Sequence, residues 1–120
     1  MTRSPSGEAD EHLPLSPAVF HVLLALAEEP RHGYAIMKRT EETSGASSGP
    51  GTVYGALRRL EEKGLVREGR RGEPERGGKP RQLYELTPLG RRVLSAEAGR
   101  MARLSELARA RDLLPGGEAG

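Results

Sequence analysis

Cysteine and tryptophan are absent from this 120-residue chain, and phenylalanine occurs once. The lack of cysteine excludes disulfides, thiolate metal sites and cysteine nucleophiles. Only 3% of the residues are aromatic and 35% are hydrophobic, which is a thin core for a lone monomer of this size. No apolar run approaches the ~20 residues that span a membrane, and residues 1–11 contain no apolar stretch of the kind a signal peptide needs. We therefore expect a soluble, cytoplasmic protein that does not enter a membrane.

Catalytic and metal-binding patterns are also missing. The three histidines, His12, His21 and His32, do not have the spacing of metal ligands. No serine is accompanied by an obvious histidine base, and no carboxylate pair is placed in a recognisable cleft. A small domain with little core also offers poor enclosure for chemistry. We expect no metal, no cofactor and no enzymatic activity.

The positive charge is concentrated in the middle of the chain. The net charge is only +2, but residues 49–92 carry eleven basic and six acidic side chains, whereas residues 1–48 carry four basic and seven acidic ones. Such a block is typical of a surface that binds a polyanion such as nucleic acid. Arginine greatly outnumbers lysine, so an alternative is that some of these arginines reflect overall composition.

Two helices are predicted in the first part of the chain. Ser16 can cap a helix that begins at Pro17 and ends before Pro30, since proline suits the first helical position. A second helix is expected from about Gly33 to Thr43. Its buried side is expected to carry Tyr34, Ile36 and Met37.

A third helix and a hairpin follow a loop rich in glycine and serine. The helix is expected from about Thr52 to Lys63, with Val53, Leu57 and Leu60 forming one buried stripe at i, i+4 and i+7. Two short strands near 65–71 and 82–87 enclose a loop rich in glycine and proline, which predicts a β-hairpin. An isolated hairpin is marginally stable, so it must pack on the helices. The expected anchors are Leu65, Tyr84 and Leu86.

The last helix is predicted to start with Thr87 as its cap and to run to about Arg111, a length on the order of 36 Å at ~1.5 Å per residue. Such a helix is longer than the small domain beneath it, so part of its apolar stripe needs a partner. A second copy of the chain is the simplest partner. The residues expected at this dimer contact are Leu94, Ala98, Met101, Leu104, Leu107 and Ala108.

Together these elements predict a mainly α fold with a small β-hairpin. We interpret residues 13–87 as a winged helix-turn-helix DNA-binding domain and residues 88–111 as a C-terminal dimerisation helix. Residues 1–12 and 112–120 have no apolar periodicity and are predicted to be disordered tails.

The third helix is expected to present the side opposite its buried stripe to a DNA major groove, with the arginine-rich hairpin beside it. Small residues near its start would allow a close approach to DNA. An alternative for Arg58 and Arg59 is ion pairing with Glu61 or Glu62 within the helix. The expected DNA contacts are Gly51, Thr52, Tyr54, Arg58 and Arg59 on the helix, and Arg70, Arg71, Arg76, Lys79 and Arg81 on the hairpin.

Three segments resemble the PadR family of transcriptional regulators. GTVYGALRRLEEKGLV at residues 51–66 resembles the family's recognition helix, and HGY at 32–34 matches a short motif at the start of its second helix. GKPRQLYELTPLGR at 78–91 is similar to the second wing strand and the start of the last helix. The similarity extends over about residues 13–110, and three segments in the right order are more specific than any one alone.

The resemblance implies a ligand-responsive repressor that dimerises through its C-terminal helix and binds double-stranded DNA at a palindromic operator. Compact members of the family often have an aromatic-lined pocket at the dimer interface. With no tryptophan, one phenylalanine and three tyrosines, this chain departs from that pattern, so a small-molecule effector is left unidentified. A second hypothesis is a winged-helix adaptor that binds another protein and no DNA.

Overall fold

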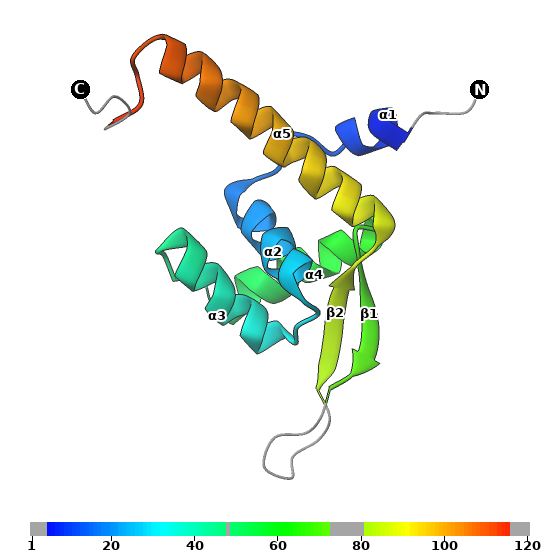
Figure 1. The fold of residues 1–120 in the computed structure, drawn as a ribbon. Helices are drawn as coiled ribbons and strands as arrows, with labels where there is room; N and C mark the ends of the chain where they lie inside the picture. The colour runs from blue at the N-terminus through cyan, green and yellow to red at the C-terminus, as the bar shows by residue number, and fades with distance from the viewer. Residues whose placement is uncertain (1–4, 48, 73–80, 116–120) are drawn as a thin grey trace.

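The structure, a computed structural model, describes residues 5–47, 49–72 and 81–115. These residues form five helices and one antiparallel hairpin (Figure 1), in agreement with the predicted fold class. In chain order the elements are α1 (Pro5–Asp10), α2 (Pro17–Glu28), α3 (Gly33–Ser44), α4 (Pro50–Glu62), β1 (Val66–Arg71), β2 (Gln82–Leu86) and α5 (Pro88–Ala110).

Helix α2 lies at the centre of the core and contacts α3, α4, α5 and β2. Its residues Leu23 and Leu26 are buried among side chains from all of these elements, because their spacing places them on one face of the helix. The predicted buried stripe of α4 is confirmed. The core residues contributed by α3, α4 and α5 are Ile36, Val53, Leu57, Leu60, Val93 and Leu94.

Side-chain caps define where the helices begin. Ser16 Oγ accepts the backbone N–H of Val19 at 3.2 Å, and Thr87 Oγ1 accepts that of Gly90 at 3.0 Å. Both starts were predicted from the sequence, and each satisfies a donor that the helix itself leaves unpaired.

The hairpin, or wing, is fastened to the helices along one edge. Val66 pairs with Leu86 at its base, and Leu65, Val66 and Leu86 are buried, which confirms two of the three predicted anchors. The third, Tyr84, is half-buried against the core. Its backbone exchanges two hydrogen bonds with Arg31, of 3.1 and 2.8 Å, so β2 is tied to the segment that enters α3.

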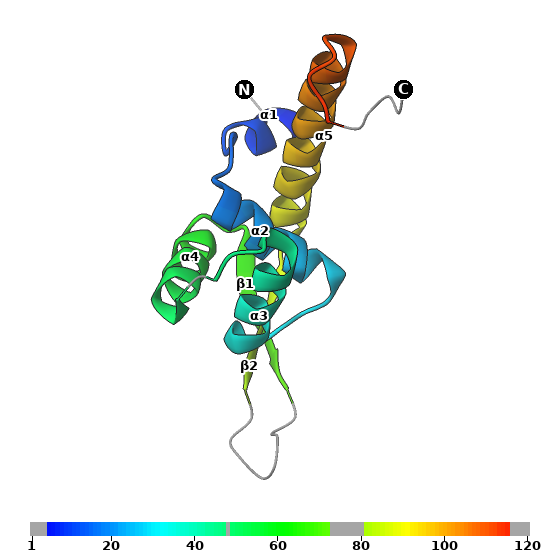
Figure 2. The same cartoon turned by 90° about the vertical axis from the view of Figure 1, so that its left-hand side faces the viewer.

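Helix α5 packs on the core only with its N-terminal half. Figure 1 shows its C-terminal half projecting beyond the other helices, and Figure 2 shows it at the end of the molecule opposite the two strands. No helix in residues 5–47, 49–72 or 81–115 is long and apolar enough to cross a membrane.

Two expectations about the N-terminal segment and α3 were wrong. Residues 1–12 were predicted to be a disordered tail, but residues 5–10 form α1, which packs on α5 with Ala9 buried. The segment is too short to show a helical period, so its packing could not be read from the sequence. Tyr34 was placed on the buried side of α3, but it is 53% exposed. Residues 34 and 36 point about 200° apart on a helix, so Ile36 faces the core and Tyr34 does not, while Met37 is partly buried against the core as predicted.

Candidate nucleic-acid interface

The exposed side of α4 is an open strip opposite its buried stripe. Gly51, Gly55, Arg58 and Glu62 recur at intervals of four, three and four residues, so they share one side of the helix. Arg58 is exposed and makes no ion pair with any residue in the described ranges. The alternative role for Arg58, pairing with Glu61 or Glu62, is therefore not the arrangement found.

The glycines of this strip are not required by the fold. A Cβ atom on Gly51 would meet nothing within 4 Å, and one on Gly55 would meet only the guanidinium of Arg59, at 3.7 Å. Neither glycine has a positive φ. Glycine in the middle of a helix, as at Gly55, costs about 0.5–1 kcal/mol relative to alanine, and no contact within the protein explains that cost. The strip has the shape expected where another molecule approaches the helix backbone.

The other predicted contacts of α4 lie on the two flanks of this strip. Thr52 lines a hollow of about 320 Å³ between α2, α3 and α4, while Arg59 lines a smaller one beside the segment before α2. Both are exposed. Tyr54 lies on the opposite flank, the one that faces α3 and the wing.

The wing brings three predicted arginines to the same end of the molecule. Arg70 and Arg71 end β1, Arg81 directly precedes β2, and all three are exposed. Arg76 and Lys79 lie outside the described residues.

Tyr54 and Gly33 are in direct contact. The phenol ring lies so close to the glycine that a Cβ there would overlap its Cε1, Cζ and Oη atoms. Tyr54 is nonetheless 45% exposed, so one side of its ring rests on α3 and the other faces solvent. This contact explains why the HGY motif has glycine at its centre, because any larger residue would overlap the ring of Tyr54. The sequence alone does not show this contact.

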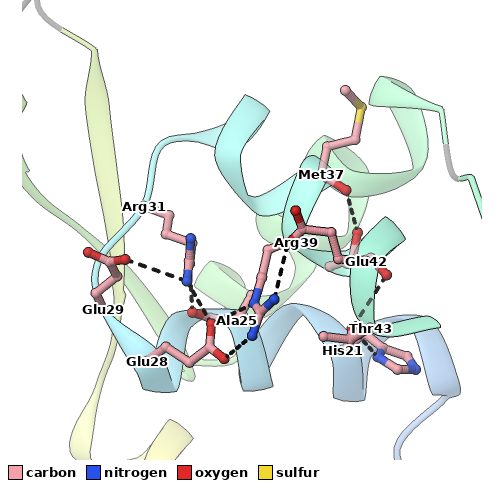
Figure 3. Close-up of polar contacts among 10 residues, drawn as sticks. His21, Ala25, Glu28, Glu29, Arg31, Met37, Arg39, Glu42 and Thr43 are labelled. Atoms are coloured by element: carbon pink, nitrogen blue, oxygen red, sulfur yellow. Dashed lines mark hydrogen bonds and ion pairs between the residues drawn. The ribbon is translucent and has the colours of Figure 1, made fainter. Parts of the chain in front are cut away.

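Ion pairs around Glu28 join α2 to α3. Figure 3 shows Glu28, at the end of α2, between Arg31 and Arg39. The Arg39 guanidinium donates to both Glu28 carboxylate oxygens, at 2.9 and 2.7 Å, and Arg31 donates to one of them at 2.6 Å. The hydrogen bonds from Arg39, aided by Arg31, lower the pKa of Glu28 to about 2. The guanidinium groups of both arginines therefore stabilise the packing of α2 against α3.

Sequence reasoning missed two residues beside Tyr54. Tyr34 and Lys38, one turn apart on the exposed side of α3, line the same cleft as Tyr54 and Arg81. Their i, i+4 spacing predicts that they share one side of α3. Their position beside the wing depends on how α3, α4 and β2 pack together, which the spacing does not show.

The predicted dimer residues fall into two groups. Leu94 belongs to the chain's own core, so it is not available to a partner and that part of the prediction was wrong. On the projecting half of α5, Leu104 and Leu107 are each 49% exposed, Met101 and Ala108 are partly exposed, and Ala98 is exposed.

Solved structures share this architecture. A PadR family transcription regulator from Clostridium difficile is 24% identical, with a TM-score of 0.67 over 79% of this chain and 97% of that one. The transcriptional regulator BldR from Sulfolobus solfataricus is 27% identical, with a TM-score of 0.62 over 88% of this chain and 69% of that one.

A sequence relative is also similar. An uncharacterised 37.1 kDa protein of transposon TN4556 from Streptomyces fradiae is 52% identical over 84 residues. The match covers 70% of this chain but only 23% of that relative. Residues 22–96 match the model of the transcriptional regulator PadR-like family. Because this match extends over more than half of the chain, the protein belongs to the PadR-like family of transcriptional regulators, which are not enzymes.

Proposed function

We propose that this regulator is a sequence-specific DNA-binding repressor that acts in the cytoplasm as a homodimer on a palindromic operator. The observation that carries the proposal is the outward strip of α4, where Arg58 stands beside two glycines that the fold does not need. A helix with this surface can enter a major groove closely enough for a guanidinium to reach base edges. The exposed arginines of the wing would contact the neighbouring backbone.

The dimer would form through the projecting half of α5. Leu104 and Leu107 are large apolar side chains left half-exposed on one helix face, and water contact with such a face is unfavourable. A second copy can cover it with the identical face, as in a two-fold symmetric contact. Two copies related in this way would present two α4 helices to two inverted half-sites about one helical turn apart.

Response to an effector would use the contact between α5 and the turn that joins α4 to β1. Thr87 Oγ1 donates to the carbonyl of Gly64 at 2.6 Å, and its backbone N–H donates to that of Leu65 at 3.1 Å. A Cβ on Gly90 would overlap the Leu65 carbonyl, so α5 and the turn that joins α4 to β1 touch backbone to backbone. A ligand that rotates α5 within the dimer would therefore change the spacing of the two α4 helices.

Selection of genomic DNA fragments by the purified protein tests this proposal. We expect enriched fragments to contain two inverted half-sites. We also expect Arg58→Ala to weaken binding by about 1–3 kcal/mol, the range for a base-reading arginine, with the melting temperature unchanged. Arg109→Ala removes the same charge from the exposed far end of α5 and should leave binding intact. A folded protein that enriches no sequence would overturn the proposal and favour the adaptor hypothesis.

A further inference from the structure

A cleft of about 800 Å³ lies between the start of α3, the side of α4 and the start of β2. Its lining includes Tyr34 and Lys38 from α3, Tyr54 from α4, and Arg81 with Tyr84 from the wing. The cleft therefore adjoins both parts of the proposed DNA surface, the outward strip of α4 and the wing.

The walls of the cleft are fixed to each other before any ligand arrives. The two backbone hydrogen bonds between Arg31 and Tyr84 join the entrance of α3 to β2. The ring of Tyr54 rests on Gly33, which joins α4 to the same turn of α3. A preformed site loses little conformational entropy on binding.

The charge of the lining suits an anion. Among the described residues that line the cleft, Glu42 has the one carboxylate, and it is paired with Arg39 at 3.0 Å. Lys38 is exposed and forms no ion pair within the part of the chain that is described. Its ammonium group is therefore available to a ligand.

Two phenol groups also line the cleft. Tyr34 and Tyr54 are 53% and 45% exposed, and a phenol O–H can donate a hydrogen bond. Together with the ammonium group of Lys38, they give the cleft hydrogen-bond donors for the oxygens of an anion.

We propose that this cleft holds one phosphate of the DNA backbone, on the strand that passes from the groove occupied by α4 to the groove under the wing. The inference rests on the proposed function and deepens it. In helix-turn-helix docking the first helix of the motif crosses the backbone, and α3 with its Tyr34 and Lys38 has that position beside α4. Tyr54 is then a phosphate ligand and not a base reader, and the cleft sets the register of the protein on DNA without reading sequence.

The test is a double-mutant cycle between the protein and single phosphates of a duplex selected by the wild-type chain. Each phosphate of one half-site is replaced in turn by an uncharged methylphosphonate. We expect one replacement to weaken wild-type binding strongly and to cause almost no further loss in Lys38→Gln or Tyr34→Phe. Lys38→Gln should also weaken specific and non-specific DNA equally and lower the salt slope by about one unit.

Lys63→Gln is the matched control, because it removes the same charge from the end of α4, outside the cleft. It should lose affinity at every replaced phosphate just as the wild type does. If Lys38→Gln instead loses affinity at every replaced phosphate, as the control does, the effects of the substitution and of each replacement simply add. That result would overturn the phosphate assignment but not DNA binding by α4. Saturable binding of a free mononucleotide that depends on Lys38, without such coupling, would overturn it in favour of a small anionic ligand. Wild-type protein that binds no duplex would overturn both proposals.

Discussion

The ring of Tyr54 lies on the backbone of Gly33, at a position where the β-carbon of any other residue would sit. This contact joins the helix proposed to read DNA to the start of the preceding helix. Tyr54 makes it with one side of its ring while the other stays exposed. A single glycine thereby fixes the direction of an exposed aromatic side chain on the proposed DNA surface.

Gly33→Ala is expected to destabilise the protein by about 1–3 kcal/mol, because the new methyl group overlaps the tyrosine ring. DNA affinity should fall as well, since the ring must leave its position. In a Tyr54→Ala background the same substitution should cost little stability, because the obstructing ring is gone. Chemical denaturation of the four proteins measures the coupling. Equal costs in both backgrounds would show that the ring does not rest on Gly33 in solution.

Gly55→Ala is expected to separate stability from binding. The added methyl group makes only an ordinary contact with Arg59, so the helix should gain about 0.5–1 kcal/mol of stability. Against DNA the same methyl group would overpack a close contact, which should weaken binding about tenfold or more. Gly99→Ala in α5, also in open space, should stabilise the protein without changing affinity. A stabilised Gly55→Ala protein with full affinity would exclude close approach of α4 to DNA.

Glu97 is a fully buried carboxylate on α5. It accepts the backbone N–H of Leu15 at 2.8 Å and forms an ion pair with Arg100 at 2.5 Å, so it holds the segment before α2 against α5. The hydrogen bond from Arg100, together with that from Leu15, keeps the pKa of Glu97 below its ordinary value of 4.5. A carboxyl whose pKa is lowered by folding stabilises the fold above its unfolded pKa and loses that contribution as pH falls through the folded pKa.

Glu97→Gln is therefore expected to reduce stability at pH 7 by about 1–3 kcal/mol, since Arg100 loses its charged partner. The difference between variant and wild type should shrink between pH 5 and pH 3, as the wild-type carboxylate is protonated. Other carboxyls, including that of Glu28, contribute to both proteins and cancel in the comparison. Thermal denaturation across this pH range measures the effect, and a gap that stays constant down to pH 3 would rule out an ionised Glu97 as the stabilising group.

Leu104→Glu combined with Leu107→Glu should convert the proposed dimer into folded monomers, because charged groups cannot be covered by an apolar face. Sedimentation equilibrium measures the change, and operator affinity should fall with it. Ala102→Glu places the same charge on the exposed opposite side of α5 and should leave the dimer intact. If both proteins sediment as the wild type does, the dimer contact lies elsewhere.

Local signals in the sequence predicted most of the fold. Ser16 and Thr87 mark helix starts by chemistry that acts within three residues, and the stripe from Val53 to Leu60 needs only helical periodicity. The misplacement of Tyr34 went against helical periodicity itself, whereas α1 and the cleft were missed because distant segments meet there. Ala9 is buried because α5 passes over it, and the cleft around Lys38 exists because β2 is tied to Arg31. Neither relationship has a local pattern that could predict it.

The salt dependence of DNA binding tests the central claim most directly, because phosphate contacts by lysine and arginine release counterions. Affinity for a selected duplex should be measured by fluorescence anisotropy from 50 to 300 mM salt, for the wild-type chain and for Arg58→Ala. We expect the logarithm of wild-type affinity to fall steeply and linearly with the logarithm of salt concentration, and Arg58→Ala to lose its preference for the selected sequence over a scrambled one. A flat salt response, or sequence preference unchanged without Arg58, would contradict the assignment of α4 and the wing as the DNA-binding surface.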